Sequence, residues 1–335
     1  MKNNILSSNL LKYLVVILLV IIFCTFVLTG CIGKKEKILI YTSTEDYRVE
    51  YLRKRLAEEF PSYDITIEYM TTGNLAAKIM AEGTATECDI IYSCEYGYLE
   101  ALARDNVLAN LSGYDTSIYT DDVIISNYYI PDVRNGGAII VNPAVLKKNG
   151  LDKPQSYEDL LKPEYKNLIS MPNPKSSGTG YMFLKSLINA WGEEEAFKYF
   201  DKLTENILQY TASGSGPVNA LVQGEVAIGL GMTAQAVTKI NEGVELEILF
   251  FEEGSPYSMY GQAIIRGKEN KKGVKEIFDF IYGVLGYEVC ELYFPEQIFK
   301  DKVYEIDNYP SKIGYADMSN NTLEEKERIL EKWKY

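Results

Sequence analysis

The chain has 335 residues, enough for two lobes or two domains, and 47% of them are hydrophobic, which allows a sizeable core and argues against disorder. Its formal net charge of −13 argues against nucleic acids and anionic lipids as partners. The sequence contains no histidine, so it lacks both the commonest general base and the commonest zinc ligand.

Residues 1–30 have the features of a secretory signal. Lys2 and Lys12 supply positive charge, an apolar run covers 13–28, and the small residues Thr29 and Gly30 precede Cys31. The stretch "LTGC" resembles the bacterial lipobox, which implies that Cys31 carries lipid and becomes the new N-terminus. An uncleaved membrane anchor is the alternative, although the run is shorter than a typical span of about twenty residues. Both interpretations place the bulk of the protein outside the cytoplasm.

The remaining cysteines favour buried thiols over a disulfide. Cys24 leaves with the signal, so Cys88, Cys94 and Cys290 remain, an odd number. Cys88 and Cys94 flank a predicted strand and could pair only if the backbone bends back. We therefore expect three inert buried thiols. The spacing of these residues matches no metal site.

The first third of the chain alternates strands and helices. Apolar or alternating stretches predict strands at 37–41, 64–70 and 88–93, and amphipathic stretches predict helices at 48–60, 71–83 and 98–108. This order is typical of a parallel sheet with crossover helices. Sheets of this kind bind ligands beyond the carboxyl ends of their strands.

Hydroxyl and acidic residues follow each of these three strands. They are Thr42, Ser43, Thr44 and Glu45 after the first, Thr71, Thr72 and Gly73 after the second, and Ser93 and Glu95 after the third. Ordinary helix capping explains any one group, since Ser, Thr and Asp favour N-cap positions. Three equivalent groups at one sheet edge favour a binding site, and the two explanations are compatible. Glu45 also suits a solvated acid at a helix start.

The rest of the chain continues the α/β pattern without an internal repeat. A strand entered through a glycine pair lies in 135–151, a helix, turn and short strand in 156–174, and helices at 181–191 and 196–203. Strand, loop, helix and strand follow in 207–231, then a strand-like run in 246–267 interrupted at 254–256, and a helical tail from 271. The lack of a linker indicates that the two halves are entwined.

Two stretches of small residues precede predicted helices. They are "PKSSGTGY" at 174–181 and "TASGSGP" at 211–217. A helix start offers unpaired N–H donors and a positive dipole end, and glycine lets a ligand approach the backbone. We therefore expect an anion on Ser176, Ser177, Gly178, Thr179, Ser213, Gly214 and Ser215. A flexible connection with a serine cap is the alternative for either loop alone.

Enzymatic interpretations have weaker support. Without histidine a nucleophilic serine lacks its usual base, and the spacing fits neither a nucleophile elbow nor a phosphate-binding loop. Lys175 with Ser176 or Ser177, and the pair Glu45 and Glu95 acting on a sugar, are the remaining options. We predict no catalytic residue and no cofactor. A secreted enzyme acting on a phosphorylated or sugar substrate stays as the competing class.

Several motifs in fixed order carry a resemblance that covers the mature chain. Besides the lipobox they include "ILIYTSTED", "TTGNLAAKI", "CDIIYSCEYGYLEALARDNVL", "NPKSSGTGY", "GEVAIGLG" and "YGQAIIRG". The sequence resembles the extracellular solute-binding lipoproteins of bacterial ABC importers, in the group that binds ferric ion, 2-aminoethylphosphonate and sugar phosphates. This resemblance implies an α/β, two-lobed, type II periplasmic-binding-protein fold with chain crossings near 131–139 and 257–263. The first lobe would comprise 37–132 and 262–335, and the second 136–256.

The resemblance also narrows the ligand. Ferric binders of this group carry adjacent tyrosines where this chain has Met232–Gln235, and Tyr128 with Tyr129 lies before the first crossing, so bare ferric ion is disfavoured. A phosphonate or phosphate ester fits better. Glu45 or Glu95, with Thr42 and Ser43, would face its amine or sugar hydroxyls.

Further expectations follow from the same resemblance. Thr233, Tyr257 and Tyr260 would lie close enough to the ligand to touch it. The partners would be an ABC permease with its ATPase and the membrane through the lipid anchor, and the protein would be a monomer. A sensor subunit of the same fold is a third possibility.

Overall fold

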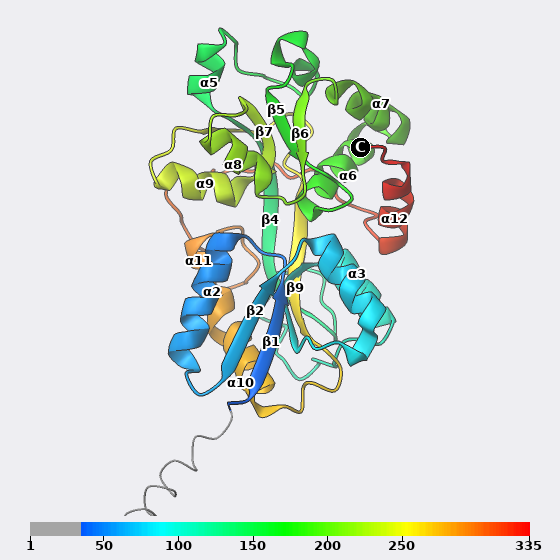
Figure 1. Cartoon of the computed structure of the whole chain (residues 1–335), viewed down its shortest axis with the longest axis vertical. Helices are drawn as coiled ribbons and strands as arrows, with labels where there is room; N and C mark the ends of the chain where they lie inside the picture. Colours follow the sequence, from blue (N-terminus) through cyan, green and yellow to red (C-terminus); the bar gives the residue numbers. More distant parts are fainter. Residues whose placement is uncertain (1–34) are drawn as a thin grey trace, which may run out of the picture.

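The computed structural model describes residues 35–335 (Figure 1). The predicted signal segment 1–30 and the predicted lipidation site Cys31 lie outside the described residues. Within 35–335, no helix combines the length and the apolar character needed to cross a membrane.

Three parallel strands form the centre of the first half, as the alternating pattern predicts. Strand β1 (Lys37–Thr42) lies between β2 (Asp64–Tyr69) and β3 (Ile90–Glu95) and is parallel to both. The crossover helices are α2 (Asp46–Glu59) and α3 (Thr72–Glu82), and α4 (Tyr96–Arg104) follows β3. Ile38 and Ile40 of β1 are buried against Leu52 and Leu56 of α2. The carboxyl ends of all three strands therefore meet at one edge.

Two long strands run between the halves. Strand β4 (Ile130–Val141) pairs with β9 (Tyr257–Ile264) through Gly136, and from Gly137 onward it pairs with β7 (Ile228–Met232). Strand β9 is antiparallel to β3, so one path of strands continues through both halves (Figure 1). Gly137 has a steric role, because a Cβ there would lie 2.6 Å from Met182 Cε on helix α6 (Gly178–Trp191). The expected crossing residues fall within these two strands.

The second half is a mixed sheet covered by helices. Strand β5 (Ile169–Pro172) is parallel to both β6 (Ile207–Thr211) and β7, while β8 (Glu247–Leu249) is antiparallel to β4. The helices are α5 (Pro143–Lys148), α6 (Gly178–Trp191), α7 (Glu193–Leu203), α8 (Gly216–Val222) and α9 (Thr233–Asn241). The helix predicted within 156–174 is wrong. In place of the helix, that stretch forms two short 3₁₀ segments before β5, and Pro163, which lacks an N–H, begins the second of them.

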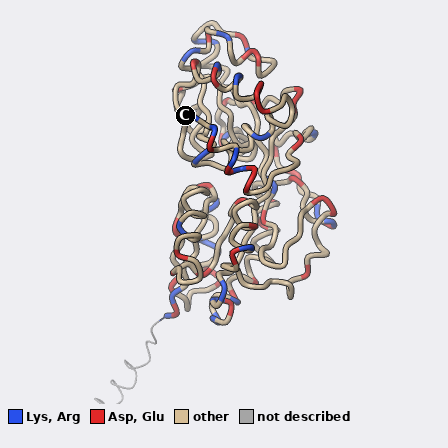
Figure 2. The backbone as a smooth tube through the Cα atoms, turned by 90° about the vertical axis from the view of Figure 1, so that its right-hand side faces the viewer, with Lys and Arg blue, Asp and Glu red and all other residues tan. Residues whose placement is uncertain are grey.

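The C-terminal region contacts both halves. Helices α10 (Lys272–Phe280) and α11 (Gly286–Leu292), joined by a π-helical turn (Ile281–Leu285), pack on the first-half core. The last helix, α12 (Leu323–Lys332), instead buries Ile329 and the following Trp333 in the second-half core. Acidic and basic positions lie close together in the part of the chain next to the C-terminus (Figure 2). The expected division assigned all of 262–335 to the first lobe, whereas α12 lies across both halves.

The cysteines behave as the sequence predicts. Cys88, Cys94 and Cys290 are buried and free. Burial raises the pKa of the Cys94 thiol to about 12, which leaves it protonated and unreactive. Within residues 35–335, the structure therefore confirms three buried thiols and no disulfide between them.

Candidate functional site

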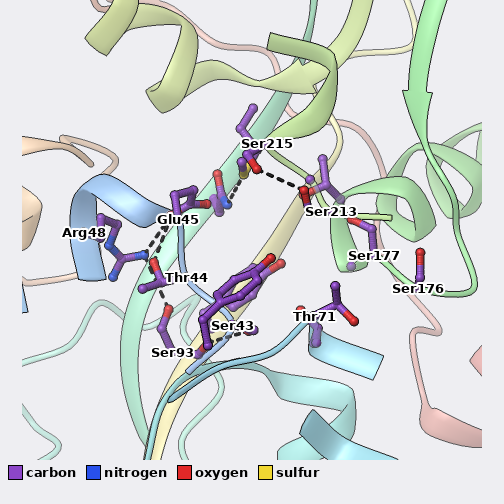
Figure 3. Close-up of a pocket in the computed structure, with 18 residues that line it drawn as sticks. Ser43, Thr44, Glu45, Arg48, Thr71, Ser93, Ser176, Ser177, Ser213 and Ser215 are labelled. Carbon is purple, nitrogen blue, oxygen red and sulfur yellow. Dashed lines mark hydrogen bonds and ion pairs between the residues drawn. The ribbon is translucent and has the colours of Figure 1, made fainter. Parts of the chain in front are cut away.

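A polar pocket lies between the two halves, beyond the carboxyl ends of β1, β2 and β3 (Figure 3). It encloses about 440 Å³ of empty space, including the part open to solvent. Its lining is dominated by hydroxyl and glycine residues: Ser43, Thr44, Glu45, Arg48, Tyr69, Thr71, Thr72, Ser93, Asn135, Ser176, Ser177, Gly178, Thr179, Ser213, Gly214, Ser215, Met232 and Tyr260.

The two small-residue loops form one wall and contact each other. Ser176 Oγ donates a hydrogen bond of 2.9 Å to the carbonyl of Ala212, and the hydroxyls of Ser213 and Ser215 are 3.0 Å apart. A Cβ at Gly214 would lie 2.9 Å from Thr179 Cβ and even closer to its hydroxyl. Glycine is therefore required here because the loops meet at this point.

Five helices begin at the pocket wall. Their N-cap residues are Glu45 of α2, Thr71 of α3, Ser177 of α6, Ser215 of α8 and Met232 of α9, and all five line the pocket. Only α6 has a side-chain cap, in which Ser177 Oγ accepts from Gly180 N at 3.4 Å. The first-turn N–H groups of the other four carry no such bond. Positive dipole ends therefore converge on one small volume.

The opposite wall comes from the edge of the first-half sheet. Ser43 Oγ donates to the carbonyl of Ser93 at 2.8 Å, and Thr44 Oγ1 donates to Glu45 Oε2 at 2.9 Å. Ser93 adopts a positive φ of 55°, uncommon for a residue with a side chain and frequent at functional sites. Hydroxyls and one carboxylate thus face the glycine loops across the pocket.

Arg48 is a buried cation in this wall that no sequence pattern singled out. It lies one turn after Glu45 on α2, and its guanidinium pairs with Asp132 at 2.9 Å and with Glu45 at 3.7 Å. Burial alone would lower the pKa of Arg48, but Asp132, Tyr92 and Glu45 raise it well above the usual value. The guanidinium therefore stays charged, although its two carboxylate partners balance it locally.

Tyr260 and Tyr69 add phenol groups to the pocket. Tyr260 lies on β9, and its hydroxyl is 2.8 Å from the position that a Cβ on Gly178 would occupy. Burial raises the pKa of Tyr260 well above 10, and Glu95 and Glu45 raise it further. Burial also raises the pKa of Tyr69. Both phenols are therefore neutral hydrogen-bond donors at physiological pH.

Most of the residues expected to touch a ligand surround this one pocket. Those brought together are Ser43, Thr44, Glu45, Thr72, Ser93, Ser176, Ser177, Gly178, Thr179, Ser213, Gly214, Ser215 and Tyr260. Among the missed residues, Arg48 could have been found from its spacing to Glu45, since positions i and i+3 share a helix face. Tyr69 is the last residue of β2, and Asn135 directly precedes the glycine pair. Only the tertiary fold brings these two residues to the pocket. Met232 is the last residue of β7.

Five of the expected residues lie outside the lining. Glu95 is fully buried in an ion pair with Lys326 of α12, so it faces no ligand. Thr42 is buried and accepts a 3.2 Å hydrogen bond from Thr44 N. Gly73 packs on the backbone of the 175–176 loop, and Thr233 is buried behind the wall. Tyr257 packs under the guanidinium of Arg134, 5.5 Å from its ring centre.

The described residues contain few grouped side chains that could bind a metal ion. Between residues 35 and 335, no three His, Cys, Asp or Glu side chains are grouped to hold a metal ion. The Tyr128–Tyr129 pair is not at the pocket, and Tyr129 donates to Glu100 at 3.0 Å.

Comparison with known proteins identifies the family. Residues 88–321 match the family described as bacterial extracellular solute-binding protein. The chain belongs to this family. It is therefore an extracytoplasmic solute-binding receptor of the class that serves ABC importers, and the recognition, fold class and general function expected from the sequence are confirmed.

The individual relatives have low sequence identity to this chain, but the similarity covers most of its length. A protein of Haemophilus influenzae described as uncharacterized is 26% identical over 274 residues, which cover 78% of this chain and 77% of that protein. A putative 2-aminoethylphosphonate-binding periplasmic protein of Salmonella typhimurium is 24% identical over 226 residues, 65% of this chain and 64% of that protein. The structure of periplasmic binding protein AfuA from Actinobacillus pleuropneumoniae, with fructose-6-phosphate bound, has a TM-score of 0.78 at 25% identity, covering 90% of this chain and 98% of that one.

Proposed function

We propose that this solute-binding protein captures a small anion, a phosphonate or a phosphate ester, in the pocket between its halves. The observation that carries this proposal is the convergence of five helix starts on one pocket wall. Main-chain N–H donors stabilise an anion at contact distance, whereas the net charge of −13 acts mostly through screened solvent. Relatives named for 2-aminoethylphosphonate and for bound fructose-6-phosphate add support.

The ligand's anionic head is assigned to the two small-residue loops. Ser177, Thr179 and Ser213 supply hydroxyls there, and Gly178 and Gly214 leave room for close backbone contact. The rest of the ligand would face Thr44, Glu45 and Ser93. Glu45 suits an amine or a sugar hydroxyl, because a carboxylate accepts hydrogen bonds from both.

Ferric ion is the second candidate, because Glu45, Tyr69 and Tyr260 are oxygen donors in the same pocket. A trivalent cation prefers such hard ligands. It would nevertheless meet the charged Arg48 and the positive ends of the helices. The anion is therefore the stronger proposal.

Closure of the two halves would follow from binding. The lobes, expected as 37–132 with 262–335 and 136–256, would move about β4 and β9, with α12 in contact with both. A ligand that contacts both lobes favours the closed state by the free energy of its additional contacts. The closed form would then dock on a permease with its ATPase, and the protein itself would act as a monomer without catalysis.

Membrane attachment is assigned to Cys31. The "LTGC" stretch would direct cleavage before this cysteine and its lipidation. Labelling of cells with a radioactive fatty acid tests this: the native protein should carry label, and Cys31→Ser should not. Labelled C31S protein would contradict the assignment.

A ligand screen tests the function. The melting temperature is measured with 2-aminoethylphosphonate, fructose 6-phosphate and ferric ion, and the solution is assayed for product. Ethylamine and fructose serve as matched ligands without the anion. We expect a shift only with the two anions, since binding to the native state alone stabilises it. A shift with ferric ion alone would favour the second candidate, and turnover of either anion would favour an enzyme.

A further inference from the structure

Glu296 is a carboxylic acid buried at the point where the chain passes between the halves. It is 8% exposed, its carboxyl oxygens are shielded from solvent, and the phenols of Tyr309 and Tyr315 lie near them. Its Oε1 is 3.0 Å from the position that a Cβ on Gly136 of β4 would occupy. Ser255 Oγ and Thr233 Oγ1 lie 3.4 and 3.9 Å from that same position. Glu296 therefore packs against the crossing strand and the start of α9.

Two residues next in sequence to those around Glu296 line the ligand pocket. Gly136 directly follows Asn135, and Thr233 directly follows Met232, and both Asn135 and Met232 line the pocket. The Oδ1 of Asn135 and the Oγ1 of Thr233 are buried and have no hydrogen-bond partner among residues 35–335. A charge on Glu296 would therefore act on a bound ligand across this part of the chain. Glu296 itself lines a second pocket together with Tyr304 and Tyr309.

Several groups around Glu296 affect the pKa of its carboxyl group. Burial raises its pKa to about 7, while Tyr309, Arg134 and Tyr315 oppose this rise. Arg134 comes from β4 and is itself paired with Asp122. Cys290 of α11 also faces the acid, and burial keeps its thiol protonated. Tyr257 of β9 lies under Arg134.

We propose that Glu296 is a positioning residue that couples anion binding to protonation: its neutral carboxyl permits tight binding, and its ionisation weakens binding. The ionised form places a negative charge beside the first residue of α9, where it offsets the positive helix end that the ligand would use. When Glu296 ionises, its carboxyl group releases the proton to solvent. By reciprocity, bound anion should make Glu296 harder to ionise. This inference rests on the proposed function.

The test compares affinities across pH in matched variants. Dissociation constants for fructose 6-phosphate and 2-aminoethylphosphonate are measured between about pH 5.5 and 8.5 for the native protein and for Glu296→Gln, which mimics the neutral acid. Glu305→Gln, at an exposed position in the same segment, is the control. Taking the ratio of native to variant constants at each pH cancels the titration of the ligand's own phosphate. We expect a ratio near one at low pH that rises about tenfold at high pH, the size expected for one nearby charge in a partly polar interior.

The outcomes separate this inference from the proposed function. A constant ratio across pH for Glu296→Gln, like that for Glu305→Gln, would overturn the coupling while the anion receptor stands. Failure of both anions to bind the native protein at every pH would contradict the proposed function, and the coupling would fall with it. If Glu296→Gln does not fold, carbon-13 carboxyl titration of the native protein decides. A Glu296 pKa that rises on ligand saturation supports the coupling, and an unchanged value refutes it.

Discussion

The guanidinium of Arg48 donates to the carboxylate of Asp132 at 2.9 Å, and this buried pair joins the first turn of α2 to the crossing strand β4. The two side chains are 2% and 0% exposed. Arg48 also lies 4.8 Å from the ring centre of Phe294. Arg48 is the only cation among the described residues that line the pocket, and this ion pair holds it in place.

The Asp132→Asn variant tests how much this ion pair contributes to the stability of the protein. Removal of one partner leaves a buried guanidinium without its main counter-charge, and we expect the free energy of unfolding to fall by about 3 kcal/mol. Urea denaturation measures it. Glu324→Gln, which removes the exposed partner of Arg104, should cost less than about 1 kcal/mol. Equal small losses in both variants would show that the buried pair has no special role.

Gly214→Ala tests the contact between the two loops. The added methyl group would meet Thr179 Cβ at 2.9 Å, so the loops must separate. We expect anion affinity to fall at least about tenfold, because a misplacement of roughly 1 Å disrupts aligned donors. Calorimetric titration with the anion that binds best measures this. Gly113→Ala, where a Cβ would meet nothing within 4 Å, is the matched control and should bind normally.

Lys326 links α12 to the first half through Glu95, and its ammonium lies 4.1 Å from the ring centre of Tyr98 and 4.5 Å from that of Tyr181. We expect Lys326→Met to lower the free energy of unfolding by about 3–5 kcal/mol, because Glu95 would remain buried as an unpaired charge. The double variant Lys326→Met with Glu95→Gln should recover most of the loss. If the double variant is as unstable as the single one, lost packing rather than charge is responsible.

Glu296 gives the unfolding equilibrium a defined pH dependence. Its pKa is about 7 in the native state against 4.5 for an ordinary glutamate, so between these pH values the native protein holds a proton that the unfolded chain has released. Stability contributed by this proton is complete below pH 4.5 and is lost as the pH rises to 7. Relative to Glu296→Gln, the native protein should lose up to about 3 kcal/mol across this window. Urea melts of both proteins at several pH values, without ligand, measure it. Parallel curves would contradict a raised pKa.

The sequence predicted which residues line the pocket best where local chemistry decides their position. Ser177 and Ser213 each precede a helix, and small hydroxyl residues favour a helix start, which the local sequence alone indicates. The alternation of strands and helices then fixes the edge of the sheet where Ser43 and Ser93 meet. The contact between Ser176 and Ala212 spans only 36 residues and two neighbouring strands.

The sequence could not show which polar residues are already paired. Glu95 and Glu45 follow equivalent strands, yet Glu95 is neutralised by Lys326, which lies 231 residues further along the chain. Asp132, which holds Arg48 from the crossing strand, lies 84 residues further along the chain. Such partners depend on tertiary contacts, and periodicity and capping signals contain no information about them.

The most direct test of the account removes the hydroxyls of the two loops together. In the triple variant Ser177→Ala, Thr179→Val and Ser213→Ala, each change removes an oxygen and keeps the backbone, so the fold should remain. Calorimetric titration with 2-aminoethylphosphonate and fructose 6-phosphate should give at least about a hundredfold weaker binding than in the native protein, at roughly 1 kcal/mol or more for each hydrogen bond. Native affinity in the folded triple variant would contradict the account, because the hydroxyls assigned to the anionic head would then contribute nothing to its binding.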